Sequence, residues 1–223
     1  NTKTYWDYRF DHDWEKMQGK EQTAFFADIA VRLMPAWLTE DIKDRKMSIC
    51  DFGCAGGQAV DVLHHVFATE VSGVDFSDRA VSLAGKTYPD YQFYVGDIVT
   101  GQMADSQMAA FCTDVGYTSN VLEHLEHPWA AAQNIVKYVK NYLLILIPFH
   151  ETLAIEEHCN IFDLYDIPLH IADFTLVFVN HMDCTRIPKS LYGGTQLFLV
   201  YANKKACKNR RTAGDLMGAF DHT

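Results

Sequence analysis

The stretch of sequence that decides the fold runs from Ile49 to Leu63 and reads ICDFGCAGGQAVDVL. The apolar run that ends at Asp51 is typical of a buried strand, and the apolar spacing of the last residues is typical of a helix. Between them lies a turn of small residues, which lets the backbone approach a ligand closely at the edge where open α/β sheets bind cofactors. The dinucleotide pattern GxGxxG would need a glycine where Gln58 stands, so the strict spacing of nicotinamide-binding proteins is absent.

Short apolar runs and amphipathic stretches alternate from Met47 to Phe149. Strand and helix in alternation predict an α/β domain with a Rossmann-like, doubly wound, mostly parallel sheet of seven strands and helices on both faces. Two further apolar runs, FTLVFVNHM and TQLFLVYANK, flank the Gly193-Gly194 pair, which favours a turn. They predict an antiparallel hairpin at the C-terminal edge of the sheet.

Three segments flank or interrupt this core. Residues 1–45 open with aromatic and charged residues and continue in a helical pattern, so they predict an N-terminal helical cap or lid. The core is expected over residues 46–205, with an insertion at 150–173 that is rich in His and acids, has no clean period, and is expected over the active face. Residues 206–223 are expected to form a C-terminal tail, where most of the basic cluster KKACKNRR is interpreted as a solvated segment.

The composition limits the class of protein. With 223 residues, of which 48% are hydrophobic, the chain is long enough for one domain with a substantial core. A formal net charge of -10 argues against a nucleic-acid substrate, because such binding draws on Lys and Arg that neutralise phosphates. The six cysteines form no CxxC pair and are expected to be reduced. The sequence has no apolar run of about 18 residues and no apolar signal core at its start, so we expect no membrane insertion and a cytoplasmic protein.

Acidic residues close three successive predicted strands, at Asp51, Asp75 and Asp97. Asp75 has the spacing of an acid that hydrogen-bonds a ribose diol, and Phe76 beside it is suited to pack on an adenine face. Asp97 is suited to accept a hydrogen bond from the adenine amino group, while Ile98 covers the ring. Each acid has an alternative role as a helix cap or turn residue.

Taken in order, these motifs resemble a known family. ICDFGCAGG, GVDFS, VGD and the later SNVLEHLEHPWAAAQNIVKYVK with LLILIPF resemble the motifs of class I S-adenosylmethionine (SAM)-dependent methyltransferases. The resemblance covers Met47 to Phe149 and, more loosely, the terminal hairpin. It implies SAM as the cofactor and methyl transfer as the reaction.

The same resemblance assigns roles to individual residues. It implies that Gly53, Ala55 and Gly57 line the methionine side of SAM and that Asn120, at the end of the fourth strand, lies near it. The opening YWDYRF resembles the aromatic lid segment of some small-molecule members, which makes Arg9 a candidate for the SAM carboxylate. The complete set of expected cofactor-binding residues is Arg9, Asp51, Gly53, Cys54, Ala55, Gly57, Asp75, Phe76, Asp97, Ile98 and Asn120.

Histidines are the candidate catalytic residues. The SAM methyl group is already activated by its sulfonium, so the protein mainly has to align the acceptor and exclude water, and a base is needed only where the acceptor starts protonated. Imidazole serves as a base near neutral pH. The candidates are His124, His150 and His158, and each has the alternative role of a hydrogen-bonded structural residue.

A metal-assisted reaction is an alternative. Glu123, His124 and His158 partly resemble the E-x-x-E-H cluster, with later His residues, of the small-RNA 2′-O-methyltransferases. Asn120 stands where that cluster has its first Glu, which removes one anionic ligand from a site that needs hard oxygen donors for Mg²⁺ or Mn²⁺. The sequence therefore predicts no metal.

The expected function is methyl transfer to an oxygen, or less readily a nitrogen, of a small molecule, with sugars, glycans or secondary metabolites as acceptor classes. The alternatives are an RNA 2′-O-methyltransferase and a SAM-binding scaffold without turnover. Base-flipping methyltransferases often carry an N/D-P-P-Y segment where this chain has Ser119-Asn120-Val121-Leu122, which disfavours that type.

Overall fold

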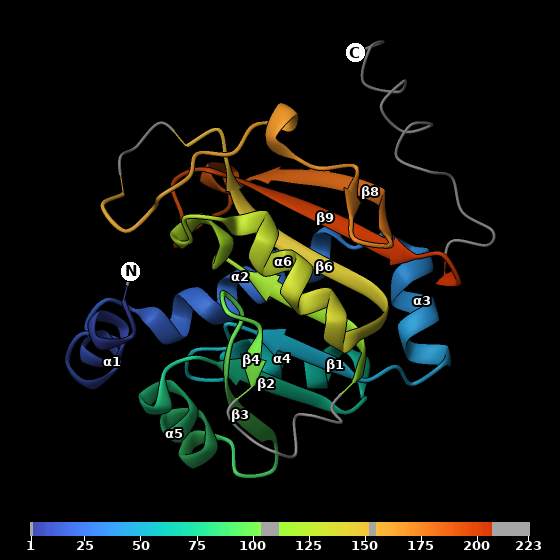
Figure 1. The fold of residues 1–223 in the computed structure, drawn as a ribbon. Coiled ribbons are helices and arrows are strands. Elements are labelled where there is room, and N and C mark those ends of the chain that lie inside the picture. Colours follow the sequence, from blue (N-terminus) through green and yellow to red (C-terminus); the bar gives the residue numbers. More distant parts are fainter. Residues whose placement is uncertain (1, 104–111, 152–154, 207–223) are drawn as a thin grey trace.

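The computed structural model describes residues 2–103, 112–151 and 155–206. One sheet organises these residues. Its strands are β1 (Ile49–Phe52), β2 (Val71–Asp75), β3 (Gln92–Asp97), β4 (Gln102–Met103), β5 (Thr113–Ser119), β6 (Val139–Phe149), β7 (His170–Ile171), β8 (Phe174–Asp183) and β9 (Thr195–Asn203). The strand order is β4-β3-β2-β1-β5-β6-β9-β8-β7 (Figure 1).

The pairing confirms the predicted mixture of directions. Strands β3, β2, β1, β5 and β6 are parallel neighbours, and β9 lies antiparallel between β6 and β8, as the predicted hairpin requires. The seven longer strands correspond to the seven predicted. Two strands of two residues each, β4 and β7, pair antiparallel at the two edges and bring the sheet to nine strands.

The α-helices are α1 (Lys3–His12), α2 (Gly19–Leu33), α3 (Ala36–Asp44), α4 (Gln58–Phe67), α5 (Asp78–Thr87) and α6 (Pro128–Ile135). They cover both faces of the sheet, as double winding requires. Along β6, Leu144 and Leu146 belong to the core that α2, α3 and α4 cover, whereas Ile145 and Ile147 belong to the core beside α6. Side chains alternate across a strand, so a strand buried on both faces needs a continuous apolar run.

The N-terminal helices begin and end for local reasons. The Thr2 hydroxyl caps α1 by accepting a hydrogen bond from the Tyr5 N–H at 3.2 Å. The helical pattern that spans α2 and α3 is interrupted at Pro35, because proline disfavours helical backbone in the residue before it and lacks an N–H. An ion pair joins α1 to the start of α5, because Nζ of Lys3 lies 2.6 Å from a carboxylate oxygen of Asp78. Helix α1 therefore lies next to the carboxyl ends of the strands (Figure 1).

Two further expectations concern the surface. Of the basic cluster at 204–211, only residues 204–206 lie within the described part of the chain, and the predicted tail from 207 onward lies outside it. Among the described residues, no helix has the length and apolar character to cross a membrane.

Candidate active site

A cavity of about 390 Å³ lies at the carboxyl ends of β1, β2, β3 and β5. Its wall is completed by α1, by the start of α2, by the short 3-10 turn η2 (Leu122–His124) and by the insertion after β6. The cavity therefore lies at the sheet edge where the sequence predicts the cofactor.

The turn after β1 has an unusual backbone, as the run of small residues predicts. Gly53 has φ 91°, Ala55 has φ 48° and Gly57 has φ 85°. At Gly53 a Cβ atom would lie 2.4 Å from a methyl carbon of Val121, so no larger residue fits there without a shift. Gly53 and Ala55 line the cavity, whereas Gly57, the N-cap residue of α4, does not. The small residues of the turn thus let a ligand in the cavity come close to the backbone.

Asp75, at the end of β2, fastens this turn. One of its carboxylate oxygens accepts a hydrogen bond from the Ala55 N–H at 3.0 Å, and the other accepts one from the Ser77 N–H at 2.9 Å. Each oxygen retains a second lone pair for a ligand in the cavity. Burial raises the pKa of Asp75 to about 6. Burial, and then the charge of Asp75, raise the pKa of Asp51 to about 8.

The end of β3 contributes the other expected acid. Asp97 accepts hydrogen bonds from the Val99 N–H at 2.8 Å and from the Thr100 hydroxyl at 3.1 Å, so it shapes the turn that follows. Asp97, Ile98 and Phe76 all line the cavity. Asp97 therefore stabilises the turn after β3 and also lines the cavity, so the two roles considered for it in the sequence are compatible.

Cys54 is an expected cofactor residue that does not line the cavity. It is fully buried, and its Sγ packs so closely on the neighbouring strand that a Cβ on Gly73 would lie 2.7 Å from it. Asn120 does line the cavity, at the end of β5 with φ 51°. Its amide oxygen accepts a hydrogen bond from Gln196 of β9 at 3.0 Å, which fixes the side chain.

Arg9 reaches the cavity from α1. Its Nη1 donates to Glu157 of the insertion at 2.6 Å and to the Tyr5 hydroxyl at 2.9 Å, and Tyr5 also donates to Glu157 at 2.6 Å. The hydrogen bond from Tyr5 and the charge of Arg9 hold the pKa of Glu157 below its ordinary value. These three residues form a clasp between α1 and the insertion. Within the described residues, the buried Nε of Arg9 has no hydrogen-bond partner.

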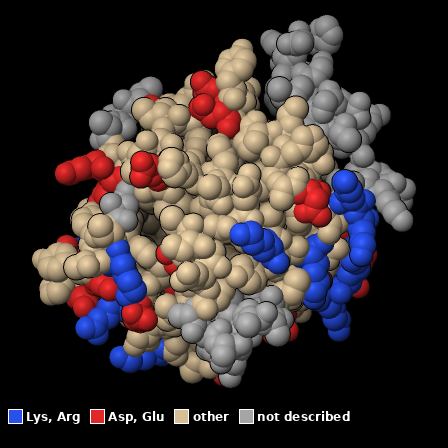
Figure 2. All heavy atoms as spheres, in the orientation of Figure 1, with Lys and Arg blue, Asp and Glu red and all other residues tan. Residues whose placement is uncertain are grey.

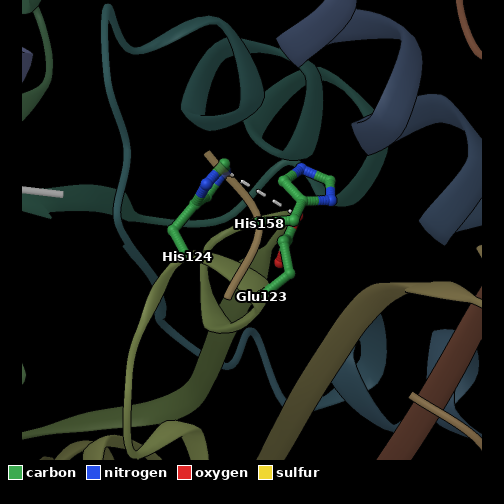
Figure 3. Close-up of side chains that lie close together, drawn as sticks. All are labelled: Glu123, His124 and His158. Carbon is green, nitrogen blue, oxygen red and sulfur yellow. Dashed lines mark ion pairs between the residues drawn. The ribbon is translucent and has the colours of Figure 1, made fainter. Parts of the chain in front are cut away.

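Beside this clasp, Glu123, His124 and His158 form a compact polar cluster that lines the cavity (Figure 3). A carboxylate oxygen of Glu123 and one ring nitrogen of each histidine lie within 4.8 Å of one another. Glu123 is 0% exposed, and neither of its carboxylate oxygens has a hydrogen-bond partner among the described residues. Burial raises the pKa of Glu123 well above its ordinary value.

The two histidines of the cluster are oriented by oxygen atoms of the insertion. His124 Nδ1 lies 3.0 Å from the Glu157 carbonyl oxygen, and His158 Nδ1 lies 2.6 Å from a Glu151 carboxylate oxygen. Burial lowers the pKa of His124 to about 4. The imidazole rings pack edge to face with centroids 4.8 Å apart.

The third candidate histidine lies elsewhere. His150 is exposed and does not line the cavity. Its backbone has φ 52°, and the centroid of its ring lies 4.1 Å from that of Phe149. The structure therefore brings together His124 and His158 but leaves His150 apart.

Three residues at the site were missed by the sequence analysis. Glu157 holds Arg9, Glu151 holds His158, and Tyr192 donates to Glu151 at 2.8 Å from the connection between β8 and β9. The available signal was that Glu157 is adjacent to His158 and that Glu151 follows Phe149 by two residues, in the insertion predicted over the active face. Nothing in the sequence pattern points to Tyr192.

Surface charge is distributed unevenly. In Figure 2, Lys and Arg side chains gather over α3 and the end of β9, on the opposite side from α1. Acidic and basic side chains are mixed near α1, for example in the pair of Lys3 with Asp78. The basic cluster on this face therefore lies away from the helix that covers the cavity.

Part of the chain matches a known family model, and the fold is similar to that of solved methyltransferase structures. Residues 50–145 match the family model described as a methyltransferase domain. A comparison with curated proteins finds no match. The fold is similar to magnesium protoporphyrin IX methyltransferase from Synechocystis PCC 6803, at 15% identity and a TM-score of 0.59, over 85% of this chain and 86% of that one.

Two further solved structures are similar over most of their length. A TehB-like SAM-dependent methyltransferase from Corynebacterium glutamicum has 17% identity and a TM-score of 0.57, with 90% of this chain and 100% of that chain covered. The plantazolicin methyltransferase BpumL has 14% identity and a TM-score of 0.59, with 91% and 96% covered. The family match runs from β1 into β6, the half of the sheet that carries the cavity, so this part of the chain matches a methyltransferase domain and the chain shares the fold of SAM-dependent methyltransferases.

Proposed function

We propose that this enzyme transfers the methyl group of SAM to an oxygen atom of a small molecule, with nitrogen as the less favoured acceptor atom. The observation that carries the proposal is that one cavity joins the turn at Gly53 to the cluster of Glu123, His124 and His158. The turn suits the cofactor, and the cluster suits an acceptor with an exchangeable proton. Both lie beneath α1, which would keep bulk water from the reacting atoms.

The first end of the cavity fits SAM. The second lone pairs of the Asp75 carboxylate suit the ribose hydroxyls, and the apolar Phe76 and Ile98 suit the faces of the adenine ring. Backbone with positive φ at Gly53 and Ala55 gives room for the methionine part. The partnerless Nε–H of Arg9 suits a carboxylate, so Arg9 would hold the amino-acid end while its other nitrogen holds Glu157.

The second end fits an acceptor hydroxyl. SAM supplies an activated methyl group, so the protein has to align the acceptor oxygen and remove its proton. We assign proton removal to His158, because the Glu151 carboxylate accepts a hydrogen bond from Nδ1–H and leaves a lone pair on Nε2. Burial lowers the pKa of His124 to about 4, which makes it a poor base, and it would instead accept a hydrogen bond from the acceptor.

The size of the cavity favours a small acceptor. A volume of about 390 Å³ is near the lower end of the range for small-molecule sites. The net charge of -10 also argues against nucleic acid. Sugars, glycans and secondary metabolites remain the acceptor classes that we propose.

The test begins with the cofactor and ends with the acceptor. Titration calorimetry with S-adenosylhomocysteine (SAH), with NAD as the control, should give binding to SAH only. Transfer of labelled methyl from SAM should then be screened on hydroxylated small molecules and, in parallel, on RNA. Label on a small molecule, lost in His158→Asn and kept in His65→Asn on the exposed face of α4, supports the proposal. Label only on RNA contradicts it, and SAH binding with no label anywhere favours a scaffold.

A further inference from the structure

We infer that Glu123, His124 and His158 bind a divalent transition-metal cation at the acceptor end of the cavity. This rests on the proposed function in one respect only, namely that the acceptor oxygen lies beside the same cluster. The first observation is geometric: three donor atoms, two nitrogens and one oxygen, lie within 4.8 Å of one another. On a tetrahedral ion with bonds of about 2.1 Å, donor atoms lie about 3.4 Å apart, so a contraction of at most about 1.4 Å in the distances between donor atoms completes the site.

The second observation is independent of that distance. The Glu123 side chain is 1% exposed, and no hydrogen-bond donor of the described residues reaches either of its oxygens. A buried carboxylate without partners is costly, because it loses its hydration and gains nothing in return. The Nε2 atom of His124 lies 4.0 Å from a Glu123 carboxylate oxygen, which is beyond hydrogen-bond distance. A bound cation would remove this cost.

The third observation concerns the histidines. Metal-binding histidines commonly donate one ring N–H to a carbonyl or a carboxylate, which fixes the tautomer and directs the other nitrogen to the metal. Here the Nδ1 atoms of His124 and His158 meet the Glu157 carbonyl and the Glu151 carboxylate. With a proton on Nδ1, an uncharged imidazole carries its lone pair on Nε2, the atom that would meet the metal. The hydrogen bond from Tyr192 holds Glu151 in turn, at 2.8 Å.

The donor set selects the kind of metal. Two imidazoles and one carboxylate suit Zn²⁺, Mn²⁺, Fe²⁺ or Co²⁺, whereas Ca²⁺ and Mg²⁺ prefer oxygen ligands throughout. Three protein ligands leave positions open for an acceptor oxygen. An acceptor hydroxyl bound there would have a lowered pKa and would release its proton to a water molecule held at another open position of the cation. The cation, and not His158, would then promote loss of the proton. Asn120 stands where the metal cluster of the small-RNA methyltransferases has its first Glu. It is not one of the three proposed ligands, because its side chain is hydrogen-bonded to Gln196 and Ser119.

The test uses the full chain and reads the metal directly. Protein dialysed against a chelator should bind one equivalent of Co²⁺, which gives visible d–d absorption, and Co²⁺ should raise the temperature of unfolding. Glu123→Gln and His158→Asn should each weaken Co²⁺ binding more than tenfold, while His65→Asn should leave it unchanged. Titration with SAH establishes that each variant keeps its fold.

The outcomes separate this inference from the proposed function. No Co²⁺ binding by the wild type overturns the inference, as does binding that survives both variants. If chelated enzyme still methylates a small molecule and His158→Asn abolishes that activity, the inference fails while the proposed function stands. If Co²⁺ binding follows the expected pattern but no small molecule is methylated, the metal site stands and the proposed function fails.

Discussion

The Asp75 carboxylate accepts a hydrogen bond from the Ala55 N–H at 3.0 Å, across the gap between the end of β2 and the turn after β1. The same side chain also accepts from the Ser77 N–H, so one buried acid fixes two segments of the cofactor end of the cavity. Its position is therefore set by the fold, before any ligand binds. A ligand that uses the remaining lone pairs meets an acceptor that is already oriented.

Replacing Asp75 tests the ribose site. Asp75→Ala should weaken SAH binding by about 2 kcal/mol, because it strands ligand hydroxyls without an acceptor. Titration calorimetry measures this loss, and Asp173→Ala, in the exposed turn between β7 and β8, is the control. Unchanged affinity in Asp75→Ala would mean that the ribose lies elsewhere.

The acids at the strand ends are the part of the site that the sequence predicts best. Asp51, Asp75 and Asp97 are tens of residues apart in the sequence, yet parallel strands bring their carboxyl ends to one edge of the sheet. The alternation of strand and helix predicts that edge without further information. The same argument does not extend to Cys54, because the alternation of strands and helices does not say whether the side chain of a turn residue points into the cavity or into the core, where Cys54 packs.

The insertion is the part that the sequence could not predict. Its residues follow no period, so no pattern says which of His150 and His158 turns toward the cavity. The outcome depends on contacts made across the chain: Glu123 accepts hydrogen bonds from the backbone of Cys159 and Asn160 through its carbonyl oxygen. Such contacts join segments that are more than 30 residues apart, so no local pattern in the sequence reports them.

The buried pair of Asp51 and Asp75 should make stability depend on pH. Asp51 has a folded pKa of about 8, whereas an unfolded chain has about 3.9. Between these values the folded state holds a proton that the unfolded state releases, so the free energy of unfolding should fall as the pH rises from about 4 to about 8. In urea unfolding, the free energy of unfolding of Asp51→Asn should depend less on pH than that of the wild type. The difference in stability between variant and wild type should therefore shift in favour of the variant as the pH rises across this range. Parallel curves for the variant and wild type would contradict the assignment.

Two glycines make a matched pair for the strained turn. Gly53→Ala adds a Cβ that meets Val121 at 2.4 Å on backbone with φ 91°, so it should destabilise the fold by about 1–3 kcal/mol. Gly85→Ala adds the same atom within α5, where nothing lies within 4 Å, and should stabilise by about 0.5–1 kcal/mol. Urea unfolding measures both. Equal effects of the two changes would show that the turn after β1 is not constrained as described.

The clasp between α1 and the insertion gives the last prediction. The Arg9 and Glu157 side chains are 19% and 25% exposed and lie 2.6 Å apart, so their pairing is only partly screened by water. If Arg9 also binds the carboxylate of the cofactor, Arg9→Met should lose about 1.5–3 kcal/mol of SAH affinity, which is typical of hydrogen bonds to a charged group. Glu157→Gln keeps Arg9 in the cavity and should lose less.

A second ligand separates this contact from a general loosening of α1. 5′-Methylthioadenosine has the adenine and ribose of SAH but no amino-acid carboxylate. Arg9→Met should therefore bind it as the wild type does, and Lys16→Met, which removes an exposed cation 4.0 Å from Asp13, should bind both ligands normally. An equal loss for the two ligands in Arg9→Met would mean that Arg9 acts by holding α1 over the cavity and makes no contact with the carboxylate.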